Sequence, residues 1–172
     1  MNALALIDRM EGFAPSLSSA VACVSDEDAR WKPPSGNWSV LEIVCHLGDE
    51  EVDDFRARLR STLEEPAREW PAIDPERWAR ERRYNEKDLG AAVRRFVTER
   101  SASIEWLRSL KSPDWNRAHV HPKFGPMPAG MLLASWAAHD ALHLRQIAKR
   151  LWELAGRDAG EFKTDYAGEW RA

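Results

Sequence analysis

Residues 39–51, SVLEIVCHLGDEE, carry the helical pattern from which the predicted fold follows. Ser39 followed by Glu42 fits a capping box, in which the serine side chain accepts the backbone N–H of the third helical position and the glutamate reaches back to the cap. Valine, isoleucine and leucine then recur at the spacing that places them on one side of a helix. The sequence therefore predicts a helix that starts at Ser39 and runs to about residue 63.

Three further segments show the same helical spacing of apolar residues. One starts near Asp88, a favourable N-cap residue, and ends before Pro113, because the residue before a proline disfavours helical backbone angles. The last has Pro128 as a first-turn proline and Gly156 as its C-terminal cap. The expected helices span about residues 4–24, 39–63, 88–111 and 129–155, with a short helix over residues 75–83.

Four helices that each bury one apolar face predict an all-α fold. We expect an up-down four-helix bundle with long connections after the second and third helices. At 172 residues the chain fits one domain, expected to span residues 1–172. Only HVHPKF, residues 119–124, gives a weak strand signal.

The composition excludes several classes of protein. The chain is 44% hydrophobic and 31% charged, and its net charge of −3 is too small for a basic stripe, so we expect no nucleic-acid partner. A membrane helix needs about 20 mostly apolar residues, and no such run is present, so we expect no membrane partner. The N-terminus lacks a secretory pattern, and Cys23 and Cys45 cannot build a disulfide framework. We therefore expect a cytoplasmic protein with both thiols reduced.

Three charged residues fall inside the apolar stripes of three different helices. They are Glu51 in the second segment, Arg100 in the third and Asp140 in the fourth. A buried charge is unfavourable unless it is paired, so we expect Glu51 and Arg100 to form an ion pair that braces the helix carrying His46. Two alternatives stay open: Arg100 could anchor an anionic substrate, and Asp140 could orient a metal-binding imidazole.

His139 and His143 are four residues apart and therefore stack on one face of the last helix. Such a pair can bind one divalent cation at about 2.0–2.1 Å, provided that a third ligand comes from elsewhere. His46 can face the pair if the second and fourth helices are neighbours. Three neutral imidazoles leave positions for water or substrate, which is typical of a catalytic metal site. Spacing alone leaves open whether the three histidines hold a metal or only form hydrogen bonds.

Four features occur in order along the chain: NWSV at 37–40, HLGDEE at 46–51, the inward Arg100, and HDALHLRQI at 139–147. In this combination they resemble the DinB-like superfamily, and the match covers nearly the whole chain. The ordered combination is specific, although each piece is not. The resemblance implies a four-helix bundle that binds a divalent metal through three histidines, which by position are His46, His139 and His143.

The resemblance implies several activities without choosing among them. Relatives include S-transferases and isomerases that use bacillithiol or mycothiol, metal-dependent hydrolases, and members with no assigned reaction. We therefore expect a metal-dependent hydrolase or a thiol-dependent S-transferase acting on a small molecule. The alternative is a non-catalytic, metal-stabilised dimer that binds a ligand or serves in a stress response. We expect the ion to be zinc or nickel, and apolar side chains left over on the helices, such as Trp106 and Trp152, predict a homodimer.

If the site is catalytic, a carboxylate close to His46 is expected to carry protons. Glu50 or Asp49 could take this role. His121, in the loop before the last helix, could reach the mouth of the site or lie exposed. Cys45 precedes His46, but its helix angle turns it about 100° away, which favours an inert buried thiol.

Overall fold

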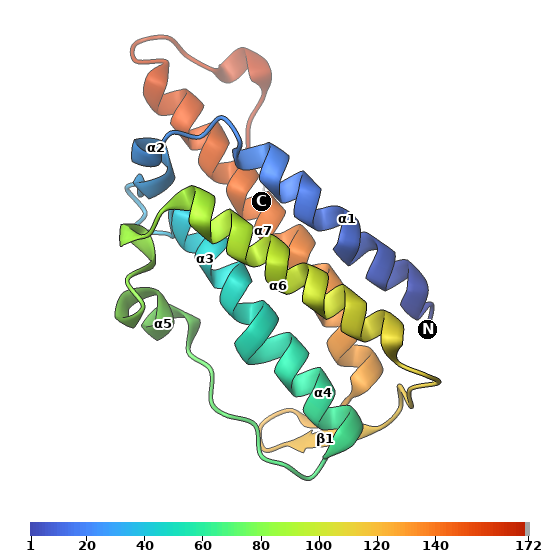
Figure 1. The fold of residues 1–172 in the computed structure, drawn as a ribbon. Helices are drawn as coiled ribbons and strands as arrows, with labels where there is room; N and C mark the ends of the chain where they lie inside the picture. Colours follow the sequence, from blue (N-terminus) through green and yellow to red (C-terminus); the bar gives the residue numbers. More distant parts are fainter. Residues whose placement is uncertain (171–172) are drawn as a thin grey trace.

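The computed structural model describes residues 1–170, and Arg171 and Ala172 lie outside the described residues. Four long helical segments form a bundle (Figure 1), so the expected all-α four-helix bundle is confirmed. Each segment begins and ends within three residues of its expected range. The first segment is α1 (Ala3–Val21). The second is continuous and consists of α3 (Val40–Asp49), the π-helical η1 (Glu50–Phe55) and α4 (Arg56–Glu64). The third and fourth are α6 (Leu89–Ser109) and α7 (Ala129–Asp158).

The four segments run up, down, down and up. Both α1 and α3 pack against α6 and α7, so α1 and α3 occupy diagonal positions in the bundle. The second and third segments are parallel, because Asp49 pairs with Arg95 and Glu51 pairs with Arg100. A third helix parallel to the second requires a connection that returns along the bundle, and residues 65–88 provide it (Figure 1).

Short elements occupy the connections between the long helices. The short helix expected over residues 75–83 is present, and the stretch with a weak strand signal forms an antiparallel hairpin. Gly125 stands at the hairpin turn with a φ of +71°, a conformation that favours glycine. These elements are α2 (Asp26–Arg30), α5 (Pro75–Glu81), η2 (Tyr84–Glu86), β1 (Ala118–His121), β2 (Gly125–Pro128) and η3 (Asp165–Ala167).

Side-chain caps explain where the helices begin. The Ser39 hydroxyl accepts the backbone N–H of Glu42, and the Glu42 carboxylate accepts the backbone N–H of Ser39 at 2.8 Å, so the capping box is confirmed. Asp88 caps α6 through the backbone N–H of Ala91. Pro128 lies at the N-cap of α7, one residue before the first-turn position expected for it. The cap expected at Gly156 is wrong, because α7 continues past it to Asp158. Side-chain caps contribute about 0.5–2 kcal/mol each.

The core consists of two apolar clusters with a polar layer between them. One cluster includes Leu17 and Phe96, and the other includes Leu59 and Trp136. The Arg100 guanidinium lies between them, 5.0 Å from the ring of Phe96 and 6.0 Å from the ring of Trp136. Full burial of one large apolar side chain contributes about 1.5–3 kcal/mol, so the clusters supply the stability that lets the bundle hold polar groups inside.

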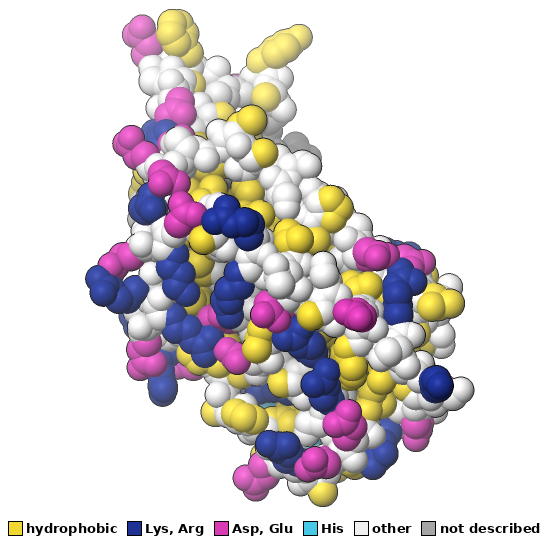
Figure 2. Space-filling view, in the orientation of Figure 1, with side chains coloured by type: hydrophobic (Ala, Val, Ile, Leu, Met, Phe, Trp, Pro, Cys, Tyr) yellow, Lys and Arg dark blue, Asp and Glu magenta, His cyan; other side chains and the backbone are white. Residues whose placement is uncertain are grey.

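Basic and acidic side chains lie next to one another on the face shown in Figure 2, with apolar side chains scattered among them. This mixture agrees with the small net charge of −3. Across residues 1–170, each helix is too short or too polar to cross a membrane.

Candidate metal centre

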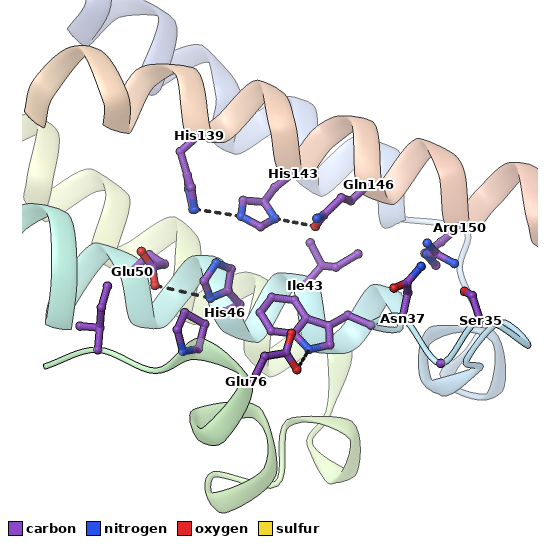
Figure 3. Close-up of a pocket in the computed structure, with 14 residues that line it drawn as sticks. Ser35, Asn37, Ile43, His46, Glu50, Glu76, His139, His143, Gln146 and Arg150 are labelled. Carbon is purple, nitrogen blue, oxygen red and sulfur yellow. Dashed lines mark hydrogen bonds and ion pairs between the residues drawn. The ribbon is translucent and has the colours of Figure 1, made fainter. Parts of the chain in front are cut away.

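Three histidine side chains meet between α3 and α7. His46 comes from α3, and His139 and His143 come from adjacent turns of α7 (Figure 3). One ring nitrogen of each residue lies within 4.8 Å of the corresponding nitrogens of the others. His46 and His143 are only 4% and 6% exposed. The structure thus brings together the three residues that were predicted as metal ligands.

The nitrogen positions fit a single divalent ion. Nε2 of His139 and Nε2 of His143 are 2.9 Å apart. Three nitrogens bound tetrahedrally to one ion at about 2.0–2.1 Å would lie about 3.3 Å from one another. The distances in the structure, from 2.9 Å to no more than 4.8 Å, bracket this value, so the cluster suits a divalent metal.

The three imidazoles are held in the neutral form, which is the form that binds metal. Burial lowers the pKa of His46 to about 3 and the pKa of His139 to about 2, and neighbouring imidazoles add to both shifts. Burial also lowers the pKa of His143, although a hydrogen bond to Gln146 opposes the change. Neutral imidazole presents a nitrogen lone pair, so a cation can bind near neutral pH without displacing protons from charged rings.

Two of the histidines have an acceptor close to their second ring nitrogen. Oε1 of Gln146 lies 2.8 Å from Nδ1 of His143. Nδ1 of His46 lies 3.6 Å from Oε1 of Glu50, and both atoms are buried without a hydrogen-bond partner among the described residues. Metal-bound histidines usually donate their second N–H to such an acceptor. These unpaired atoms therefore fit a site in which a bound ion fixes the orientation of His46.

Of the two predicted proton carriers, Glu50 lines the cavity at the histidines and Asp49 does not. Burial, together with the neighbouring Asp54 carboxylate, raises the pKa of Glu50 to about 9. Glu50 belongs to the π-helical segment η1, and such segments are frequent at functional sites. Asp49 is 1% exposed and is bound by the Tyr84 hydroxyl and the Arg95 guanidinium. It therefore joins α3 to η2 and α6.

Arg100 is held in a buried network that does not reach the cavity. It pairs with Glu51 and with Asp140, each at 2.6 Å, and donates a hydrogen bond to the backbone carbonyl of Met10. Nε1 of Trp136 also donates to Glu51, at 2.8 Å. The predicted pair of Glu51 and Arg100 is therefore present, and Asp140 is engaged by Arg100 rather than by an imidazole. The structure places Arg100 as a brace between helices and not as a wall of the cavity.

His121 and Cys45 lie outside the histidine cluster. His121 lines a second cavity, of about 870 Å³, together with Trp70 and Phe124. The thiol of Cys45 faces the backbone carbonyl of Tyr84, and the residue is 2% exposed. Burial raises the pKa of the Cys45 thiol to about 11, which agrees with an inert buried thiol.

The three histidines form part of the wall of a cavity of about 630 Å³. Trp38, Glu76, Gln146 and Arg150 also line it (Figure 3), and none of them was predicted to belong to the site. Gln146 and Arg150 lie three and seven residues after His143 on the same face of α7, so helical spacing alone could have identified them. Trp38 and Glu76 come from the connection before α3 and from α5, whose positions no periodic pattern predicts.

Comparison with known proteins shows the family. The family model described as the DinB superfamily matches residues 11–147. The chain belongs to the DinB superfamily. The resemblance drawn from the sequence motifs is thereby confirmed.

Several related proteins carry names that refer to a metal. Two proteins of Oceanobacillus iheyensis, each named "putative metal-dependent hydrolase", are similar to this DinB-superfamily chain. One is 27% identical over 143 residues, covering 82% of this chain and 81% of the relative, and the other is 23% identical over 151 residues, covering 87% and 86%. A protein of Bacillus licheniformis with the same name is 28% identical over 135 residues, covering 76% and 74%.

One solved structure has the same fold as this member of the DinB superfamily. YfiT from Bacillus subtilis is described as "a probable metal-dependent hydrolase with an unusual four-helix bundle topology". It superposes with a TM-score of 0.80 at 19% sequence identity, over 89% of this chain and 87% of YfiT. The likeness establishes the four-helix fold on which the histidine cluster is built.

Proposed function

We propose that this member of the DinB superfamily is a metal-dependent hydrolase of small molecules, with one zinc or nickel ion held by His46, His139 and His143. The observation that carries the proposal is the convergence of three neutral imidazoles on a cavity. A structural zinc site is normally closed by four protein ligands, whereas a catalytic site keeps a position open. Three ligands beside a cavity match the open, catalytic kind of site. The names of the relatives support hydrolysis.

A divalent ion in this position supplies Lewis-acid chemistry, because it lowers the pKa of a bound water and polarises a carbonyl or phosphoryl oxygen. Glu50 carries out the proton transfers of the reaction. Burial and the Asp54 carboxylate favour the protonated carboxyl of Glu50, which can donate its proton to a leaving group. A bound cation would instead favour the ionised carboxylate of Glu50, whose Oε1 can accept a proton from the attacking water.

The walls of the cavity orient the substrate. Ile43 and Trp38 provide apolar surface, and the ring of Trp38 lies 4.8 Å from the ring of His46. Nε1 of Trp38 donates to the Glu76 carboxylate at 3.3 Å, which fixes the indole in place. A volume of about 630 Å³ lies in the range of pockets that hold small organic ligands.

Thiol-dependent S-transfer is a second candidate for the same cavity. The volume leaves room for a thiol beside a substrate. Neither cysteine lines the cavity, since Cys45 is buried against Tyr84 and Cys23 is exposed. The thiol would therefore be a separate low-molecular-weight molecule, whose pKa falls beside a cation.

The test is turnover by zinc-loaded and nickel-loaded protein, purified without a polyhistidine tag, on panels of esters, amides and phosphoesters with and without thiols. Hydrolysis that stops with a chelator and returns with the metal supports the hydrolase, and turnover only with thiol supports the transferase. His139→Ala should abolish activity, whereas His121→Ala, outside the cluster, should keep it. A protein that binds one ion but turns over nothing in any panel contradicts both enzymatic functions and favours a metal-stabilised ligand-binding dimer.

A further inference from the structure

Arg150 is a buried arginine at the end of the cavity away from His139. The residue is 6% exposed and lies beside Asn37 and Ser35 (Figure 3). Within the described residues, its Nη1 is hydrogen-bonded to Glu153, whereas its Nε is buried and has no acceptor. A guanidinium has five N–H donors, so Arg150 retains donors for a further acceptor.

The positive charge of Arg150 is only partly balanced. Glu153, its partner, also pairs with Lys149 at 3.6 Å. One carboxylate therefore serves two positive side chains, which leaves a positive charge in excess at this end of the cavity. A buried charge without a full partner is unfavourable, and an anionic ligand would relieve it.

The two acidic residues of the cavity lie elsewhere. Glu50 is beside His46, and Glu76 is bonded to Nε1 of Trp38 between the two ends (Figure 3). Neither is paired with Arg150. The cavity thus has a cationic end at Arg150, and both of its carboxyl groups lie away from that end.

Arg150 shares one face of α7 with the histidine ligands. His139, His143, Gln146 and Arg150 follow at intervals of four, three and four residues, which keeps them on the same side of a helix. The seven residues from His143 to Arg150 correspond to about 10 Å along the helix axis. Since one continuous cavity contacts all four residues, a single extended molecule can reach both ends.

We propose that Arg150 binds a terminal oxyanion of the substrate whose reacting group lies at the three histidines. This inference rests on the proposed hydrolase function and adds the substrate class, an extended small molecule with one carboxylate or phosphate about 10 Å from the reacting bond. A guanidinium binds both groups through paired, charge-assisted hydrogen bonds. A second anionic group near the middle of the molecule would be repelled by Glu76.

The test compares alkyl hydroxamates that carry different groups at the far end, with binding to zinc-loaded protein measured by calorimetry. The hydroxamate binds the ion, and a spacer of about nine bonds covers 10 Å, because three bonds of extended chain span roughly 3.3–3.6 Å. The far ends are a carboxylate, a phosphonate and a neutral carboxamide. We expect one of the anionic probes to bind at least about tenfold more tightly than the carboxamide. The tighter anion then identifies the group that Arg150 recognises.

Three variants separate recognition of the anion from a structural role of Arg150. Arg150→Gln should lose the preference for the anion while binding the carboxamide as before. Arg145→Gln removes the same charge from an exposed position of α7 outside the cavity and should keep the preference. Glu153→Gln removes the competing carboxylate and should increase the preference, a change that a purely structural arginine does not predict.

Equal affinity of the wild type for all three probes overturns the Arg150 proposal, even if Arg150→Gln fails to fold. A folded, zinc-binding Arg150→Gln protein that keeps the preference also overturns it. If no probe binds the wild type, the result contradicts the proposed metal centre, and the Arg150 proposal that depends on it is overturned as well. The two failures are distinguishable, because the carboxamide probe requires only the ion.

Discussion

The Arg100 guanidinium donates two hydrogen bonds to the Asp140 carboxylate, at 2.6 and 2.7 Å, and so joins α6 to α7 inside the bundle. Asp140 is adjacent to His139. The same guanidinium pairs with Glu51, which follows His46 on the second segment. One buried arginine therefore connects both of the helical segments that carry the histidine ligands.

Replacing Arg100 by leucine should reduce the free energy of unfolding by about 3–5 kcal/mol, because Glu51 and Asp140 would remain buried without their partner. Urea denaturation measures this loss. Arg94→Leu, at an exposed position of the same helix, is the matched control and should change stability by no more than about 0.5 kcal/mol. Equal losses in the two variants would show that the buried network does not brace the bundle.

Replacing Glu50 by glutamine should lower kcat by about 10²–10⁴-fold and leave the metal content unchanged. The amide keeps the shape of the side chain but cannot exchange a proton in the reaction. Asp53→Asn, in the same π-helical segment, is the control and should keep most of the activity, since Asp53 pairs with Arg82 at the surface. Wild-type turnover by Glu50→Gln would remove Glu50 from the mechanism.

One of the two thiols should react quickly in the folded protein, and both should react after unfolding. Cys23 is exposed, whereas Cys45 is buried and its pKa is raised to about 11 by burial. Because the thiolate is the reactive form, the Cys45 thiol stays protonated and inert until the pH approaches that value. Titration with a chromogenic disulfide measures the count, and Cys23→Ser should abolish the fast reaction. A second fast thiol in the folded wild type would show that Cys45 is accessible.

Local interactions allowed much of the fold and the ligand set to be predicted from the sequence. The capping box at Ser39 and the N-cap at Asp88 depend only on nearby residues, so they located the starts of two helices. The inward positions of Glu51, Arg100 and Asp140 followed from apolar stripes with helical spacing. The histidine ligands required, in addition, the order of motifs that resembles the DinB-like superfamily.

The features that could not be predicted from the sequence depend on contacts between distant parts of the chain. Every residue of α3 is buried, so no side of this helix faces solvent. Helical spacing therefore cannot show which neighbouring element each residue faces. Asp49 consequently could not be separated from Glu50, although one faces α6 and the other faces the cavity. The parallel direction of α6 depends on the path of residues 65–88, and the place of His121 depends on a hairpin. Neither follows from periodicity.

The metal content of the protein, purified without an affinity tag and measured by elemental analysis, shows whether the three histidines hold an ion. We predict one zinc or nickel ion per chain in the wild type, and its loss in His46→Ala, His139→Ala and His143→Ala. His121→Ala, which changes a histidine of the second cavity, should keep the ion. A wild type that binds no stoichiometric ion after zinc or nickel is supplied, or a His139→Ala variant that binds as much as the wild type, would contradict this prediction.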